Sequence, residues 1–274
     1  MSDQPRPDSS ELLEQDALRA RKFRTSRTIL ALVLREMSTT HGRTPGGYLW
    51  AVVDPVAGLL LMSLVFSLAF RNPPVGTSFP LFYATGYLPF VMFNDVANKM
   101  ATSINFSRSL LAYPAVTFLD ALVARFLLTL LTHAMVSYII FFTLIFVFGA
   151  RSQIDLPYIL LGFLTAGTLA IGIGTLNCYL MTTFNVWERT WQILTRPLFI
   201  ISGIFFAFAD LPKAAQDVLW YNPLVHVIGI MRSGFYASYK SDYVNLTFVF
   251  VIAITTFALG LLLLWRNHRR LLEG

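Results

Sequence analysis

The sequence predicts an all-α integral membrane protein that crosses the bilayer in about six helices. Of its 274 residues, 55% are hydrophobic and 13% are charged, whereas about a quarter of the residues of a soluble domain are charged. The hydrophobic residues also form long runs, and roughly 20 such residues span a hydrocarbon core about 30 Å thick. Four runs contain no Asp, Glu, Lys or Arg, namely residues 72–94, 126–150, 156–187 and 243–265, and a fifth, 49–70, contains only Asp54.

Residues 1–45 precede the first span and are expected to form a cytoplasmic N-terminal segment. Within it, residues 24–37 have a helical pattern, with apolar residues on one face and Arg24 and Arg35 on the other. A basic amphipathic helix of this kind lies in the membrane interface, and a helix packed on a partner protein has the same pattern. Both interpretations stay open. The apolar face consists of Ile29, Leu30, Val33, Leu34 and Met37.

A transmembrane domain is expected over residues 46–265, followed by a cytoplasmic basic tail, 266–274. The charge-free stretches 197–209 and 218–231 are too short to cross the bilayer, and Pro223 breaks the second. We therefore expect short re-entrant or outer helices over residues 210–242, between the fifth and sixth spans. The predicted spans are residues 48–70, 79–96, 121–148, 157–184, a fifth that begins near residue 188, and 244–265.

Basic residues indicate the orientation of these spans. With the predicted topology, 16 of the 21 Lys and Arg residues fall on one side of the membrane. Positive residues are retained in the cytoplasm, so both termini are expected there, and an even number of spans is required. The formal net charge of +6 is thus explained by membrane topology, and no nucleic-acid partner is expected.

Small residues recur every four positions along the fourth predicted span. Such a strip lets a neighbouring helix approach closely, so we expect tight helix packing there. The strip consists of Gly162, Ala166, Ala170 and Gly174.

The sequence lacks the motifs of an enzyme. It contains no G-x-x-x-x-G-K-[ST] loop for ATP, and its single cysteine, Cys178, has no partner for a disulfide or a metal site. The four histidines fall in separate elements without metal-ligand spacing, and no nucleophile has a recognisable base. We therefore expect no catalytic residues, no metal site and no cofactor bound by this chain.

Charged or titratable residues near membrane depth are candidates for a functional role, because they face a bundle interior or an aqueous path. Arg125 either lines a substrate path or extends to the membrane surface from the entry of the third span. His133 lies deeper, where a hydrogen bond to a neighbouring helix is favoured. Tyr48 and Trp50 fit an interfacial aromatic belt, but aromatic rings also stack on sugars, and the sequence does not separate these roles.

Three motifs resemble the permease subunits of ABC-2 type polysaccharide exporters. The first is GGYLWA at residues 46–51 followed by Asp54-Pro55, and the second is RPLFIISGIFF at 196–206. The third is WYNPLVH at 220–226, followed by Arg232-Ser-Gly. The resemblance covers about residues 25–270, and within the family the motifs are most similar to those of capsular polysaccharide export permeases.

This resemblance implies a division of labour between chains in a bacterial inner membrane. Two copies of the permease would pair with two cytoplasmic ATPase subunits, which bind ATP and Mg, and a periplasmic polysaccharide co-polymerase or export adaptor would join them. Residues 98–113 would form the coupling helix that contacts the ATPase. The coupling residues would include Asn98, Lys99, Ser103, Asn105 and Arg108.

The resemblance also implies a path for lipid-linked capsular polysaccharide. The polymer would enter near the cytoplasmic end of the first span and pass along the homodimer interface, with Tyr48, Trp50, Arg125 and Arg232 as candidate path residues. One departure is Gly229, where relatives often carry an acidic residue.

Other substrates and classes of protein stay open. O-antigen and teichoic acid exporters share these motifs, and an ABC-2 exporter of small lipids or drugs is a further alternative. A secondary transporter would have internal repeats with paired broken helices, and a membrane enzyme would have clustered polar groups.

Overall fold

A computed structural model describes residues 24–41, 47, 49–106, 117–148 and 154–273. These ranges contain helices and connecting turns and no β-strand, which confirms the predicted all-α class. The α-helices are α2 (Arg24–His41), α3 (Leu49–Ala69), α4 (Phe79–Ala101), α6 (Phe118–Phe148), α7 (Leu156–Thr183), α8 (Trp187–Ile201), α9 (Lys213–Leu219), α10 (Pro223–Phe235) and α11 (Leu246–Glu273), with one 3₁₀-helix at Phe208–Asp210.

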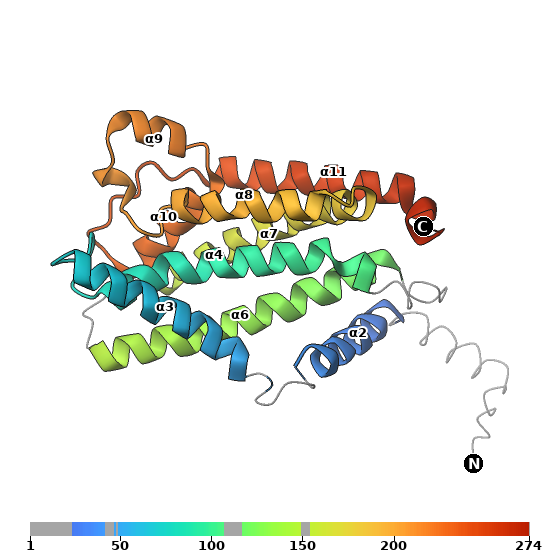
Figure 1. Cartoon of the computed structure of the whole chain (residues 1–274), viewed down its shortest axis with the longest axis horizontal. Coiled ribbons are helices and arrows are strands. Elements are labelled where there is room, and N and C mark those ends of the chain that lie inside the picture. The colour runs from blue at the N-terminus through green and yellow to red at the C-terminus, as the bar shows by residue number, and fades with distance from the viewer. Residues whose placement is uncertain (1–23, 42–46, 48, 107–116, 149–153, 274) are drawn as a thin grey trace, which may run out of the picture.

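The long helices form a bundle with two different ends (Figure 1). α2 and the C-terminal end of α11 lie at one end, which we call the α2 end. α9, α10 and the beginning of α4 lie at the other, which we call the α9 end. α8 runs along the bundle from the α2 end toward the α9 end (Figure 1).

In the part of the chain that the structure describes, four helices are long and apolar enough to cross a membrane: α3, α6, α7 and α11. They correspond to the first, third, fourth and sixth predicted spans. α4 has 23 residues but carries Asn94, Asp95, Asn98 and Lys99 in its second half, and α8 has only 15 residues. The six-span count therefore stays a prediction.

α7 is the central helix of the bundle. In its most apolar 18-residue stretch 56% is buried, compared with 17% in the corresponding stretches of α3 and α11. Its predicted small-residue strip lies against two neighbours. Gly162 contacts Met231 of α10, and a Cβ on Gly174 would lie 2.9 Å from the Cβ of Met100 in α4. Ala166 and Ala170, between them, are fully buried.

α2 packs on α6 of the same chain. Ile29 and Val33 are half-buried, while Leu30 and Leu34 are 59% and 57% exposed. The predicted amphipathic helix is therefore present, and part of its apolar face is covered by the third predicted span. Leu30 and Leu34 leave apolar surface for lipid or another chain.

The N-terminus of α6 is capped by an acidic residue, Asp120. Asp120 accepts hydrogen bonds on Oδ2 from the backbone N–H and the hydroxyl of Thr117. The Thr117 hydroxyl accepts one from the backbone N–H of Asp120. This reciprocal arrangement is a capping box, so Asp120 has a structural role at the start of the helix.

The predicted outer region, 210–242, contains α9 and α10. Pro223 occupies the first turn of α10, where its missing N–H is tolerated, and the side chain of Asn222 accepts a hydrogen bond from the backbone N–H of Leu224. Residues 218–231 are thus divided between two helices. A Cβ on Gly229 would lie 2.5 Å from the hydroxyl oxygen of Tyr243, so the close approach of this ring explains why glycine, and no acidic residue, stands there.

Candidate functional site

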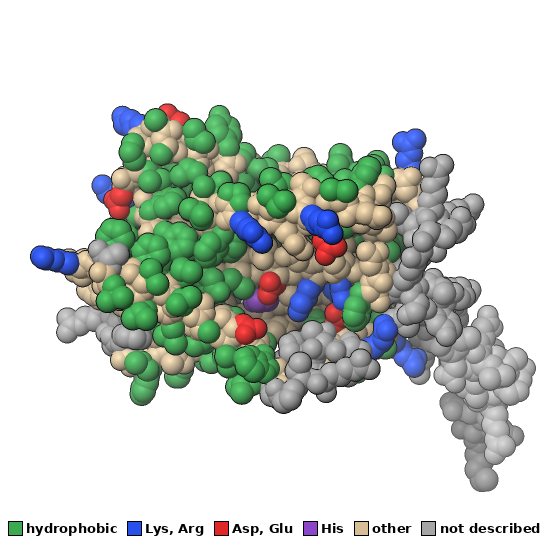
Figure 2. All heavy atoms as spheres, viewed as in Figure 1, with side chains coloured by type: hydrophobic (Ala, Val, Ile, Leu, Met, Phe, Trp, Pro, Cys, Tyr) green, Lys and Arg blue, Asp and Glu red, His purple; other side chains and the backbone are tan. Residues whose placement is uncertain are grey.

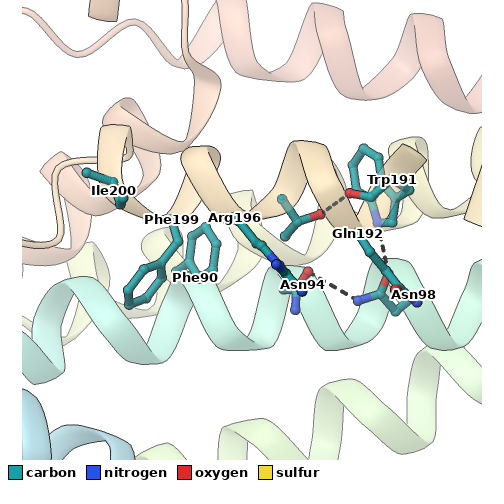
Figure 3. Close-up of a pocket in the computed structure, with 9 residues that line it drawn as sticks. Phe90, Asn94, Asn98, Trp191, Gln192, Arg196, Phe199 and Ile200 are labelled. Carbon is teal, nitrogen blue, oxygen red and sulfur yellow. Dashed lines mark hydrogen bonds between the residues drawn. The ribbon is translucent and has the colours of Figure 1, made fainter. Parts of the chain in front are cut away.

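A groove between α4 and α8 is the candidate functional site (Figure 3). Its volume of about 470 Å³ is within the range of small-molecule and cofactor sites. The lining residues recur every three or four positions on each helix, so each helix contributes one face. α4 contributes Phe90, Asn94 and Asn98, and α8 contributes Trp191, Gln192, Thr195, Arg196, Phe199 and Ile200.

A chain of hydrogen bonds orients the amides at the end of the groove nearer the α2 end. The Trp191 indole Nε1 donates to Asn98 Oδ1 at 2.8 Å, and Asn98 Nδ2 donates to Asn94 Oδ1 at 3.1 Å. An indole N–H can only donate, so each amide must accept with its oxygen and donate with its nitrogen. The chain therefore ends with the NH₂ group of Asn94 as a hydrogen-bond donor.

Among the described residues that line this groove, Arg196 is the one that carries a charge. Its side chain and that of Asn94 project from the two facing helices (Figure 3). Among the residues that the structure describes, it has no ion pair or hydrogen bond to its guanidinium group. The helix begins at Trp187, so at 1.5 Å per residue Arg196 lies roughly 13 Å along α8.

Aromatic side chains continue from the groove toward α3. Phe199 contacts Phe90 with ring centroids 5.2 Å apart and Phe205 at 5.3 Å. Phe205 in turn lies 5.1 Å from Phe66 of α3, which lies 5.1 Å from Tyr83. We call these five residues the aromatic row. Tyr83 and Phe90 are buried, so only the half-buried rings of the row offer surface for stacking on flat or ring-shaped groups.

An acid–histidine pair lies beside the groove residues of α4. His133 Nε2 is 3.0 Å from Asp95 Oδ2, which confirms the expected hydrogen bond from His133 to a neighbouring helix. The Asp95 side chain is still 43% exposed. Because an exposed carboxylate is costly in lipid, this side of α4 faces water or protein. Figure 2, viewed from the same side as Figure 1, shows charged side chains gathered in the middle of the molecule, between apolar surfaces.

Arg125, a predicted path residue, lies in a different place. It is 7% exposed and joins α6 to α2 and α4. Its Nη2 and Nε contact the two carboxylate oxygens of Glu36 at 3.0 and 3.2 Å. Its Nη1 donates to the Lys99 carbonyl at 2.8 Å and to the Thr102 hydroxyl at 3.0 Å. All its nitrogens are engaged, so in this structure Arg125 joins three helices, and its role as a path residue stays a prediction.

Arg232, also a predicted path residue, is 1% exposed in α10. It donates to the carbonyls of Phe206 at 2.7 Å and Ile204 at 2.9 Å, and its guanidinium lies 4.1 Å from the ring centre of Phe82. Gly203, with φ 89°, makes the turn that presents these carbonyls. Arg232 therefore holds the loop that carries Phe205 into the aromatic row, and its role as a path residue stays a prediction.

Of the other two predicted path residues, the structure describes one, and it is not among the residues that line the groove. Trp50 is 52% exposed in the first turn of α3, and Tyr48 lies outside the described residues.

The predicted coupling segment begins inside α4. Asn98 and Lys99 belong to the last turns of α4, and a helical turn follows at 103–106. Ser103 is fully buried, with its hydroxyl 3.6 Å from Cys178 Sγ, so its side chain is turned away from any partner surface. Asn105 is exposed, and Arg108 lies outside the described residues.

Sequence reasoning did not assign a role to Asn94, Gln192 or Arg196. Asn94 and Asn98 are four residues apart in the polar second half of α4, which is a signal of a shared polar face. Arg196 stands in the RPLFIISGIFF motif. No group of three or more His, Cys, Asp or Glu side chains with metal-binding geometry occurs among the described residues.

Comparison with known proteins gives matches along most of the chain. Residues 27–236 match the family model described as ABC-2 type transporter. The chain is 32% identical to the polysialic acid transport protein KpsM of Escherichia coli, over 86% of this chain and 92% of that protein. It is 28% identical to the capsule polysaccharide export inner-membrane protein CtrC of Neisseria meningitidis serogroup A, and 26% identical to BexB of Haemophilus influenzae, another protein of that description. Each of these two matches covers 86% of this chain and 89% of the relative.

Proposed function

The chain belongs to the ABC-2 type transporter family, and from this premise we propose that it is the transmembrane permease of a capsular polysaccharide exporter. The observation that carries the proposal is the α4–α8 groove, which combines aromatic faces with oriented amides. Sugar rings have apolar faces that stack on aromatic rings, and hydroxyl groups that hydrogen-bond to amides. The names of the relatives support the same class of substrate.

In this proposal the polymer enters the groove from the α2 end and moves along the aromatic row toward the α9 end. Asn94 and Asn98 bind hydroxyl groups, while Phe90, Trp191 and Phe199 contact ring faces. Stacking is tolerant of sequence because it depends on ring faces rather than on a fixed pattern of donors, so successive sugars can occupy the same place.

The energy for this movement comes from a separate ATPase, because the chain has no ATP-binding loop of its own. We propose that two permeases and two ATPases assemble, and that the ATPase contacts the segment that follows α4. Asn98 lines the groove, while the carbonyl of the next residue, Lys99, accepts from Arg125. A displacement of the α4 C-terminus is therefore transmitted directly to the groove.

The orientation follows from charge. The α2 end carries the basic N-terminal helix and the last turns of α11, so it is the cytoplasmic end in this proposal. The α9 end then faces the periplasm of a bacterial inner membrane, where a co-polymerase or export adaptor would meet the exposed residues of α9.

Deletion of the gene, with complementation from a plasmid, tests this function. We expect polymer to accumulate inside the cell on deletion and to return to the surface with the wild-type gene. Phe199→Ala should restore export several-fold less well, because it removes the ring that joins the groove to the aromatic row. The matched control, Phe146→Ala, removes a ring that is 81% exposed on α6 and should restore export fully.

Two results would contradict the proposal. Polymer export could be unchanged by the deletion while sensitivity to small toxic compounds rises, which would indicate a drug or small-lipid exporter. Equal export by the Phe199→Ala and Phe146→Ala variants would remove the groove from the path.

A further inference from the structure

Resting on the proposed function, we propose that Arg196 and Asn94 form an oxyanion subsite in the α4–α8 groove, which binds a carboxylate or phosphate group of the exported molecule. The subsite is distinct from stacking on the aromatic row, because it recognises charge.

The first observation is the direction of the hydrogen bonds in the groove. Trp191 donates to Asn98 and Asn98 donates to Asn94, so the Asn94 amide presents its NH₂ group. Thr195 donates its hydroxyl hydrogen to the Trp191 carbonyl at 2.7 Å. Asn94 and Arg196 line the same groove and both offer N–H donors, so together they suit a ligand that accepts hydrogen bonds.

The second observation is the position of Arg196 itself. A guanidinium group has five N–H donors in a planar fork that matches the two oxygens of a carboxylate or phosphate. Arg196 lies roughly 13 Å along α8 with an exposed side chain, and no described carboxylate pairs with it. An anionic ligand would supply the missing partner.

The negative groups around the groove do not supply that partner. Asp95 is one residue from Asn94 on α4, but its carboxylate contacts His133 on α6. Asp54, on α3, is not among the lining residues. No described carboxylate lies within 4.0 Å of the Arg196 guanidinium, so the cation is available to a ligand in this conformation.

Two sources can supply the oxyanion: an acidic sugar in the polymer, or the phosphate of its lipid anchor. Both have two or more acceptor oxygens on one centre, and both fit one guanidinium fork plus one amide NH₂ group. A binding experiment with matched probes separates them.

The experiment uses the permease–ATPase complex in nanodiscs and measures probe affinity by calorimetry. One pair of probes is an oligosaccharide of acidic sugars and the same oligosaccharide with its carboxylates reduced to alcohols. The other pair is a short-chain phosphatidic acid and the corresponding diacylglycerol. We expect the wild-type complex to prefer the charged member of at least one pair by about tenfold or more, as charge-assisted bidentate contacts are stronger than neutral ones.

The variants assign that preference to the subsite. Arg196→Gln should abolish it while leaving the affinity for the uncharged probe unchanged, and Arg196→Lys should retain part of it. Asn94→Asp keeps the shape but replaces the donor by a negative acceptor, so it should also abolish the preference. The matched control is Arg189→Gln, which removes an arginine from the same helix outside the groove.

The outcomes are separable. A preference for the acidic oligosaccharide that is lost in Arg196→Gln identifies the sugar as the source, and the same result with phosphatidic acid identifies the lipid anchor. Wild-type binding of both oligosaccharides with no charge preference in either pair overturns the subsite and leaves the exporter function intact. Failure to bind either oligosaccharide, with no lipid preference, counts against both proposals. A preference that survives Arg196→Gln overturns the assignment to Arg196.

Discussion

Arg125 and Arg232 are two buried arginines at opposite ends of the bundle, and they are stabilised in different ways. Arg125 is paired with the Glu36 carboxylate and joins three helices at the α2 end. Arg232 contacts two backbone carbonyls and an aromatic face at the α9 end, and no described carboxylate lies within ion-pair distance of it.

The difference separates two kinds of mechanical connection. The α2 end depends on one ion pair that links the N-terminal amphipathic helix to the end of α4, so its geometry depends on charge. The α9 end depends on the shape of a loop that presents its carbonyls to Arg232, so its geometry depends on packing. A force applied by an ATPase at the α2 end would thus be carried by an ion pair, while the loop that carries Phe205 is held by neutral groups.

The largest expected effect comes from breaking the ion pair. Glu36→Gln keeps the side-chain shape but leaves the Arg125 cation without its counter-charge, and removal of one partner of a buried pair costs about 3 to 5 kcal/mol. We expect a lower melting temperature of the purified permease and weaker coupling of ATP hydrolysis to export. The control is Arg27→Gln on the exposed face of the same helix. Equal melting temperatures for the two variants would show that the junction is not charge-dependent.

A somewhat smaller effect is expected at the α9 end. Arg232→Gln retains a donor but cannot reach both carbonyls, and each buried acceptor left unsatisfied costs about 1 to 3 kcal/mol. Export should fall because Phe205 loses its position in the aromatic row. The measurement is the accessibility of a cysteine placed at Phe205, with Lys213→Gln of the same region as the control. Unchanged labelling in Arg232→Gln would contradict a positioning role.

The packing at Gly229 gives a second test that the α9 end depends on shape rather than on charge. Gly229→Ala places a Cβ against the Tyr243 hydroxyl, which lies 2.5 Å from the ideal Cβ position, and such overpacking costs about 1 to 3 kcal/mol. Tyr243→Phe removes that oxygen, so the double variant should recover part of the lost thermal stability. If Gly229→Ala and the double variant lose the same thermal stability, contact with the Tyr243 hydroxyl is not the reason why glycine is required at position 229.

The smallest effect is a pH dependence at the α9 end. His226 Nδ1 accepts a hydrogen bond from the backbone N–H of Asn245, so Nε2 carries the proton and donates to the Trp220 carbonyl at 2.8 Å. Burial lowers the pKa of His226, although the bond to Trp220 opposes this in part. The unfolded region then binds more protons than the folded one, so stability is complete above the ordinary pKa near 6.5 and falls as the pH drops below it.

Hydrogen exchange of residues 220–235 at pH 7.5 and 5.5, corrected for intrinsic exchange rates, measures this dependence. We expect faster opening at the lower pH and no such change in His226→Gln. Equal pH dependence in both proteins would assign the effect to another group.

The sequence predicted the helices that consist of long apolar runs. It also predicted features that depend on neighbouring residues of one helix. The strip on α7 and the short outer helices around Pro223 are examples, because the spacing of small residues and the position of a proline act locally. The same local logic could not place Arg125, whose partner Glu36 is 89 residues away.

The groove could not be predicted for the same reason. Trp191 and Asn98 are 93 residues apart, and their hydrogen bond exists only because α8 returns along α4. The fifth predicted span begins near residue 188 and α8 begins at Trp187, but the sequence does not show that Arg196 faces α4. The sequence alone does not show which arginines are buried and which line the groove, because that depends on how the helices pack.

The most direct test of the account places a photoreactive amino acid at Gln192, in the groove, and at Leu160, which is 59% exposed on α7. After illumination of exporting cells, the permease is purified and probed for covalently attached polymer. The account predicts polymer attached at position 192 and only lipid attached at position 160. Lipid alone at both positions, or equal amounts of polymer at both, would contradict the claim that the α4–α8 groove carries the polysaccharide.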